Sequence, residues 1–209
     1  LRDWSHRRPR QEWKLIEAAS SLCVGPDSNN PCQWWANSLQ DATLTRSCLF
    51  DDRVVIESNG NVRNAHGTGT WLEPFQTTDG VAQCGTFEPP SVWANQGTWS
   101  FDETNSLLTM NSAYLGLIKA HNGYEVMNDG SVDDIDVTRT YTITGQTLTH
   151  YCGGDNVEAK EMTATIDYGG GLWTFRYVIT ECEHNIGCMD PTATNYDPAA
   201  TRCDGHCLY

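Results

Sequence analysis

The sequence predicts an all-β protein, an antiparallel meander of about eight strands closing into a barrel or sandwich, with a small Cys-rich segment at its C-terminal end. Three observations predict this class. Apolar and polar residues alternate with a period of two in several segments, turn-forming residues separate those segments, and no long amphipathic helical stripe interrupts them. Strands that follow one another through short turns favour a meander, which hides its edges by closing on itself.

The expected strands can be followed along the chain. "WKLI" (13–16) begins the series, and Asn59-Gly60 marks a hairpin turn inside the run "CLFDDRVVIESNGNVRNA" (48–65). Three further turns are predicted at 102–105, at Gly145-Gln146 and at Gly169-Gly170-Gly171. After the last of these, alternation places on one strand face Trp173, Phe175, Tyr177 and Ile179.

Other segments lack this alternation. The stretches 11–20 and 112–120 are the two candidates for short helices, although neither has a convincing cap and a long enough apolar stripe. The stretches 17–45 and 71–97 are predicted to be long loops, because they are polar or proline-bearing and carry few strand signals. Long loops on a rigid β scaffold are where binding surfaces usually lie.

Charge and alternation divide the chain into three parts: a basic leader at 1–11, the β-domain at 12–180 and a Cys-rich tail at 181–209. The whole chain has a net charge of −14, and four of its 13 basic residues lie in the leader. An acidic body of this kind excludes nucleic acid as a partner, since phosphate binding depends on Lys and Arg. This negative charge suits the binding of metal cations or neutral ligands. Alternatively, it simply keeps the protein soluble. No run is long and apolar enough for a transmembrane segment.

Nine cysteines are scattered through the chain, which favours disulfides and an extracellular or cell-surface location over a cytosolic metal cage. Cys48 with Cys84 and Cys23 with Cys32 are the expected pairs in the β-domain. An odd number of cysteines leaves at least one thiol free or bonded to another chain.

Several blocks of the β-domain carry a family resemblance, among them "SLCVGP", "GTWSFDETNSLLTMN" and "GGGLWTFRYV". Over residues 12–179 the chain resembles a secreted, lipocalin-like β-domain of marine Bacteroidetes proteins, often found beside glycoside hydrolase family 16 domains of the laminarinase type. The resemblance implies a β-barrel and a glycan-associated accessory role. The chain departs from that pattern by adding Cys23 and Cys32 around the first loop.

The tail "GCMDPTATNYDPAATRCDGHCLY" (187–209) resembles a second element, a short Cys-bounded repeat near the C-termini of secreted Bacteroidetes proteins that is usually taken to bind calcium. Calcium prefers six to eight oxygen ligands, and the side chains that offer them are Asp190, Asn195, Asp197 and Asp204. A disulfide between Cys188 and Cys207 would close a ring of about 20 residues, worth roughly 3 kcal/mol. The simpler alternative is that the Asp-Pro and Asn-Tyr-Asp-Pro elements only form turns.

Zinc is the competing metal, because thiolate and imidazole ligands suit it. The candidates in the tail are Cys182, His184, Cys188, Cys203, His206 and Cys207. Their spacing matches no usual zinc pattern, and an oxidising compartment favours disulfides, so calcium is the expected ion.

Aromatic residues of the two long loops form the candidate ligand site. Indole faces stack on the C–H surface of sugars, and amide or carboxylate side chains bind hydroxyls. The candidates are Trp34, Trp35, Asn37, Trp71, Glu73 and Trp93. Alternatively, these tryptophans pad the core or the loops, which is the commoner use of the residue.

No catalytic motif is present: the E-x-D-x-x-E pattern of family 16, G-x-S-x-G, H-E-x-x-H and a Walker loop are all absent. The sequence therefore predicts a secreted, non-enzymatic accessory module that binds a polysaccharide or cell-surface glycan. The alternative is a structural or adhesive filament subunit that self-assembles through its termini and its calcium-type tail. A lipocalin-like lipid carrier is a third possibility and requires an apolar cavity.

Overall fold

The computed structural model describes residues 10–67, 69–86, 96–125, 138–152 and 155–180, together with short pieces of the tail at 186–187, 190–194, 196, 202–203 and 208. The chain divides into two compact units. The first comprises 1–146 and 160–179, and the second comprises 147–159 and 180–209.

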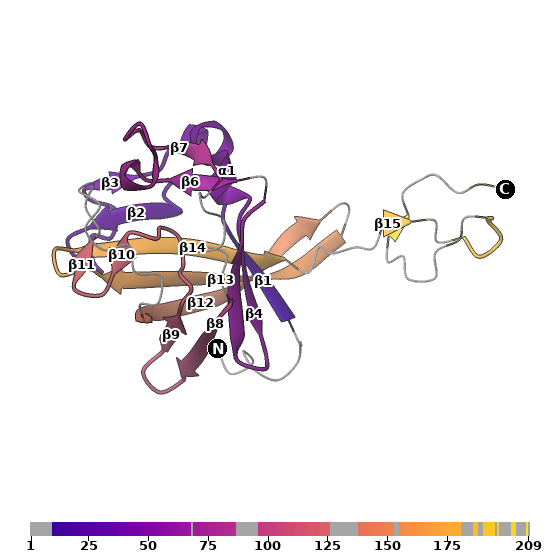
Figure 1. The fold of residues 1–209 in the computed structure, drawn as a ribbon. Coiled ribbons are helices and arrows are strands. Elements are labelled where there is room, and N and C mark those ends of the chain that lie inside the picture. Colours follow the sequence, from indigo (N-terminus) through magenta and orange to yellow (C-terminus); the bar gives the residue numbers. More distant parts are fainter. Residues whose placement is uncertain are drawn as a thin grey trace. The chain divides into compact units, whose positions relative to one another are not determined.

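The first unit contains a closed antiparallel barrel (Figure 1). Its eight strands, in the order of their pairing, are β1 (Arg10–Leu15), β4 (Arg53–Glu57), β5 (Asn61–Ala65), β8 (Gln96–Asp102), β9 (Leu107–Asn111), β12 (Thr138–Cys152), β13 (Asp155–Asp167) and β14 (Leu172–Thr180). Leu15 of β1 lies opposite Tyr177 of β14, and this pairing closes the ring. The predicted fold class is confirmed, and the closure decides for a barrel rather than a sandwich.

Three of the four predicted turns are confirmed. Gly60 has a φ of +91° between β4 and β5, and Gly169 has a φ of +84° between β13 and β14, a region that favours glycine. The turn between β8 and β9 is held by Asp102, whose carboxylate accepts the Thr104 N–H at 2.9 Å. The turn expected at Gly145-Gln146 is wrong, because β12 continues through it to Cys152. Threonine and tyrosine on both sides favour an extended chain, and a single glycine does not outweigh them.

The first strand of the barrel is interrupted. β1 and β2 (Leu22–Gly25) both pair with β14, so that Leu15 lies opposite Tyr177 and Leu22 opposite Phe175. β3 (Trp35–Ala36) then pairs with β2 and extends the sheet. The predicted loop at 17–45 therefore contains two short strands.

Short elements gather at the same end of the barrel as β2 and β3 (Figure 1). The π-helix η1 (Asp41–Thr45) leads into α1 (Ser47–Phe50), and β6 (Thr70–Leu72) pairs with β7 (Gln83–Gly85), with the 3-10 turn η2 (Pro74–Gln76) between them. A further hairpin joins β10 (Ala120–His121) to β11 (Tyr124–Glu125). The hairpins β4–β5 and β8–β9 turn at the other end of the barrel.

The segment 112–121 forms no helix before β10. It packs instead against side chains that point into the barrel: Ala113, Leu115 and Leu117 join the same buried cluster as Phe175. Tyr141 accepts the Leu115 N–H at 3.0 Å through its phenol oxygen. The apolar side chains of this segment thus pack against those of the strands inside the barrel. Because side chains such as Tyr141 accept its backbone N–H groups, this short run with a glycine does not need a helix to satisfy them.

Both disulfides expected in the β-domain are present, Cys23–Cys32 and Cys48–Cys84. The first clips the loop between β2 and β3, and the second joins α1 to β7. These bonds are consistent with an extracellular protein. Among the residues that the structure describes, no helix has the length and apolar character needed to cross a membrane.

In the second unit, β15 (Ile186–Gly187) pairs in parallel with β16 (Arg202–Cys203). The Thr194 N–H donates to the Leu208 carbonyl at 2.7 Å, which brings the two halves of the tail together.

Candidate functional site

A pocket of about 310 Å³ lies in the first unit, where the strand extension meets the short elements at the barrel end. We call it the indole pocket, because three tryptophans line it. Its described lining consists of Val24, Trp35, Arg46, Trp71, Glu73, Pro74, Ala82, Lys119 and Trp173.

One wall of the indole pocket is built on paired strands. Val24 of β2 lies opposite Trp35 of β3 and opposite Trp173 of β14, so backbone pairing fixes the spacing of these two tryptophans. Their rings meet edge to face, with centroids 6.3 Å apart and an interplanar angle of 64°. Such a T-shaped arrangement is a favoured geometry for aromatic pairs.

The facing wall comes from β6 and η2. Trp71 lies on β6, and Glu73 is the N-cap residue of η2, where its backbone N–H donates to the side chain of Gln76 at 2.9 Å. The Cys48–Cys84 disulfide ties α1 to β7, the partner strand of β6. This wall is therefore held by a cap and a covalent bond.

Two cations lie on indole faces in the pocket. The Arg46 Cζ is 4.3 Å from the centroid of Trp71 and 5.0 Å from that of Trp35. The Lys119 Nζ is 5.0 Å from the centroid of Trp173. These are cation–π distances.

Carboxylates complete the charge pattern. Lys119 lies 3.6 Å from Glu73 Oε2 and 3.0 Å from Glu125 Oε1. Burial lowers the pKa of the Arg46 guanidinium, and the negative charge of Glu73 acts in the opposite direction. The pocket thus combines apolar ring surface with two cations: Lys119, which is ion-paired, and Arg46, which lies on two indole faces.

The structure brings together three of the six residues that the sequence put forward as ligand-binding. Trp35, Trp71 and Glu73 come from the two predicted loops and line the same pocket. Trp34 is 52% exposed and is not part of the described lining, and its ring covers Gly171, where a Cβ atom would approach it to 2.4 Å. Trp93 lies outside the described residues.

Asn37 serves the fold rather than the pocket. It is buried, its side-chain oxygen accepts the Leu22 N–H at 2.8 Å, and its amide donates to the Ala18 carbonyl at 2.8 Å. These bonds bridge the interruption between β1 and β2. A buried amide with its hydrogen bonds used in this way is not available to a ligand.

Sequence reasoning missed Arg46, Lys119 and Trp173 as pocket residues. Alternation correctly placed Trp173 on the inner strand face with Phe175, but gave no sign that the strand end borders a pocket. Arg46 and Lys119 follow from how η1 and the segment 112–121 fold, and no periodicity or motif marks them.

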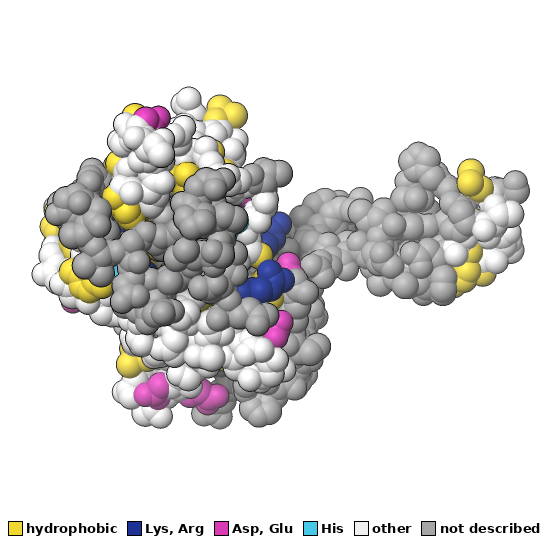
Figure 2. All heavy atoms as spheres, in the orientation of Figure 1, with side chains coloured by type: hydrophobic (Ala, Val, Ile, Leu, Met, Phe, Trp, Pro, Cys, Tyr) yellow, Lys and Arg dark blue, Asp and Glu magenta, His cyan; other side chains and the backbone are white. Residues whose placement is uncertain are grey.

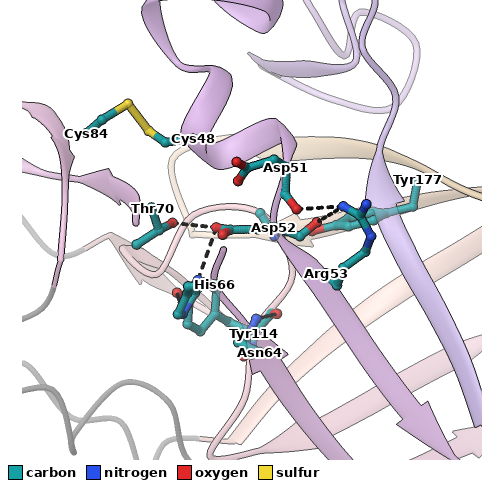
Figure 3. Close-up of polar contacts among 11 residues, drawn as sticks. Cys48, Asp51, Asp52, Arg53, Asn64, His66, Thr70, Cys84, Tyr114 and Tyr177 are labelled. Atoms are coloured by element: carbon teal, nitrogen blue, oxygen red, sulfur yellow. Dashed lines mark hydrogen bonds and ion pairs between the residues drawn. A yellow bond between two sulfur atoms is a disulfide. The ribbon is translucent and has the colours of Figure 1, made fainter. Parts of the chain in front are cut away.

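A second polar cluster lies beside α1, with two buried members, Thr70 and Tyr114, and two half-buried ones, Asp52 and His66 (Figure 3). Asp52 Oδ2 lies 3.1 Å from His66 Nδ1 and also accepts the hydroxyl of Thr70. On the far side of the ring, His66 Nε2 lies 3.4 Å from the phenol oxygen of Tyr114. His66, which the sequence presents as an isolated residue, is therefore one member of a chain of polar contacts.

The geometry of this cluster favours a structural role. Burial raises the pKa of the Asp52 carboxyl, although His66 and Thr70 act against it, and burial also raises the pKa of Tyr114. The space that Asp52 and Tyr114 border with the barrel wall is about 10 Å³, roughly the size needed for one water molecule. That space is too small for a substrate, and equally for a lipid.

Of the four calcium ligands expected in the tail, the structure describes Asp190. Its Oδ1 accepts the backbone N–H and the hydroxyl of Thr192 at 2.9 and 2.7 Å, the pattern of an Asx turn. Asn195, Asp197, Asp204, Cys188 and Cys207 lie outside the described residues. Within the described part of the chain, no three His, Cys, Asp or Glu side chains gather as a metal site. Calcium binding by the tail stays a prediction.

No known protein family, no curated protein and no solved structure gives a significant match to the chain. The indole pocket is therefore the feature of the chain that points to a function.

Proposed function

We propose that this protein is a secreted, non-catalytic module that binds a glycan in the indole pocket. The observation that carries the proposal is the convergence of Trp35, Trp71 and Glu73, from two separate loops, with Trp173 from the barrel. The indole surface that Arg46 and Lys119 do not cover offers the weakly negative face that suits sugar C–H groups, and Glu73 offers oxygens to hydroxyls. The volume of about 310 Å³ is at the lower end of small-ligand sites.

The surroundings of the pocket support a binding surface. Trp34, Leu44 and Val81 are exposed by 52%, 68% and 57%, and each lies within two residues of a pocket-lining residue. Exposed apolar side chains that gather around a concave site are typical of interaction surfaces. The resemblance of the β-domain to modules that accompany glycoside hydrolases points in the same direction.

The ion pairing of the pocket carboxylate supports a non-catalytic role. Glu73 is buried and lies 3.6 Å from Lys119, which is also 3.0 Å from Glu125. Glycoside hydrolysis needs a carboxyl group that donates a proton to the leaving group, and a carboxylate beside an ammonium group suits a hydroxyl acceptor instead.

The proposal is tested by glycan-array screening of the oxidised protein, followed by calorimetry with the hits. Trp71→Ala should weaken binding about five- to a hundredfold, since stacking on one aromatic side chain contributes about 1–3 kcal/mol to affinity. Trp99→Ala is the matched control, because Trp99 lies on β8 and donates to the Glu57 carbonyl, away from the pocket. Equal losses in the two variants, or no array hit at millimolar ligand, would contradict the proposal.

A further inference from the structure

Two indole rings cover the face of the Arg46 guanidinium, and the N–H groups at its edge have no acceptor among the described residues. The indoles of Trp71 and Trp35 lie at 4.3 and 5.0 Å from its Cζ. Within the part of the chain that the structure describes, its N–H groups make no hydrogen bond and no close ion pair, although the side chain lines a pocket. A half-buried arginine with five N–H donors thus lines the pocket without an acceptor among the described residues.

The other pocket cation is already engaged. Lys119 is within ion-pair distance of both Glu73 and Glu125, at 3.6 and 3.0 Å. Arg46 feels Glu73 only as a more distant charge, which opposes the effect of burial on its pKa. A half-buried guanidinium without an acceptor bears a desolvation cost that a ligand oxygen can offset.

We propose that the indole pocket takes a saccharide with an anionic substituent, a carboxylate or a sulfate ester, and that Arg46 binds that substituent. This inference rests on the proposed function of the pocket and deepens it. The planar fork of arginine matches two oxygens of either anion in a bidentate contact. Because Trp71 and Trp35 already hold the guanidinium, little side-chain freedom is lost when the anion binds.

Nearby carboxylates compete with an anion at this position. On the face seen in Figure 2, acidic side chains lie at the end of the barrel where β8–β9 turns and also at the end that carries the short elements. Glu73 is within ion-pair distance of Lys119, and Glu73 and Asp41 act on Arg46 as charges without a close ion pair to it. A bidentate contact at hydrogen-bond distance is stronger than such longer-range repulsion, which physiological salt largely screens beyond about 8 Å.

Calorimetry with three probes of equal length tests the inference: a neutral gluco-oligosaccharide hexamer, a uronic-acid hexamer and a sulfated hexamer. We expect an acidic hexamer to bind at least tenfold more tightly than the neutral one, and the two acidic probes distinguish carboxylate from sulfate. Arg46→Met keeps an unbranched side chain between the indoles and removes the donors. It should weaken binding of the acidic probe by about ten- to a hundredfold, a loss clearly larger than that of the neutral probe.

Arg63→Met is the matched control, because it removes the same charge from β5, outside the pocket lining, and should change neither affinity. Arg46→Lys should restore only part of the acidic preference, since lysine lacks the fork. Melting curves of each variant report whether it folds. Neutral binding that equals or exceeds acidic binding, or a loss in Arg46→Met that is equal for both, would overturn the inference and leave the proposed function standing. If none of the hexamers binds, both fail.

Discussion

The phenol oxygen of Tyr177 accepts a hydrogen bond of 2.6 Å from the backbone N–H of Gly116, across 61 residues of sequence. It joins the last barrel strand to the segment 112–121 inside the barrel, where both partners are buried. The bond gives that irregular segment part of the backbone satisfaction that a helix would otherwise supply.

Tyr177→Phe should lower the free energy of unfolding by about 1–3 kcal/mol, because it leaves the Gly116 N–H buried without an acceptor. Tyr168→Phe removes a hydroxyl from a half-buried tyrosine and should stay within about 0.5 kcal/mol of the parent protein. Urea unfolding measures both. A loss no larger for Tyr177→Phe than for Tyr168→Phe would show that the bond contributes nothing.

Gly116→Ala should be more damaging than its single methyl suggests. Gly116 has a φ of +68°, and a Cβ atom there would lie 2.1 Å from the ring of Phe175. Backbone strain at this positive φ and overpacking against Phe175 together should lower the free energy of unfolding by about 3–5 kcal/mol. Gly60→Ala shares the positive φ, at +91°, but meets nothing within 4 Å, so strain alone should cost about 1–2 kcal/mol. Thermal melts that place the two variants together would contradict the packing argument.

Asp52 should make the fold less stable as the pH rises. Burial raises its pKa above the ordinary value of 3.8, so the folded state holds the proton more tightly than the unfolded chain does. The stabilisation that protonated Asp52 gives to the folded state is complete below pH 3.8, the ordinary pKa of the carboxyl. It is lost as the pH rises through the raised pKa of the folded state. Asp52→Asn should therefore gain stability relative to the parent as the pH rises, which urea unfolding across a pH series measures.

Asp102→Asn is the control for this pH dependence, with the opposite sign. Hydrogen bonds from Asn105 lower the pKa of the Asp102 carboxyl, so the ionised carboxylate stabilises the folded state above pH 3.8. This stabilisation is lost as the pH falls through the lowered pKa. The asparagine variant should lose stability relative to the parent as the pH rises. A profile that falls with pH for the Asp52 variant would contradict the first assignment, and one that rises with pH for the Asp102 variant would contradict the second.

The Cys48–Cys84 disulfide should contribute about 4 kcal/mol to stability and Cys23–Cys32 about 3 kcal/mol, since stabilisation grows slowly with the length of the closed loop. The sequence separations are 36 and 9 residues. Urea unfolding of the Cys48→Ser/Cys84→Ser and Cys23→Ser/Cys32→Ser proteins measures the difference. A larger loss from the shorter loop would mean that the clip between β2 and β3 acts on the native state and not only on the unfolded chain.

Sequence patterns predict the barrel well where local chemistry determines the structure. Asn59-Gly60 and the glycines at 169–171 permit the backbone angles that their turns require, and alternation assigns the inner face of β14 correctly. Gly145 misleads, because one glycine also fits an extended strand. The interruption after β1 has no local signature, since it depends on Asn37 reaching back to bond Leu22 and Ala18.

The candidate site is only half predictable for the same reason. Indoles and a glutamate in long loops are the residue types of a sugar site, and this chemistry selects Trp35, Trp71 and Glu73. Arg46 and Lys119 reach the pocket through tertiary folding of irregular segments, which no period describes. Asn37 was selected by residue type as well, but an amide in a loop is equally suited to satisfying backbone groups.

The interruption of the first strand has a consequence for how such a protein can diversify. β2 is bonded to β14 beyond the part that closes the barrel, and β3 is bonded to β2. The Cys23–Cys32 disulfide holds the loop that joins β2 to β3. Loops of this kind tolerate insertion and exchange at small entropic cost. A library of grafted sequences at 26–31 would keep Cys32 and could therefore alter recognition at the neighbouring Trp35 while the barrel keeps every one of its own pairings.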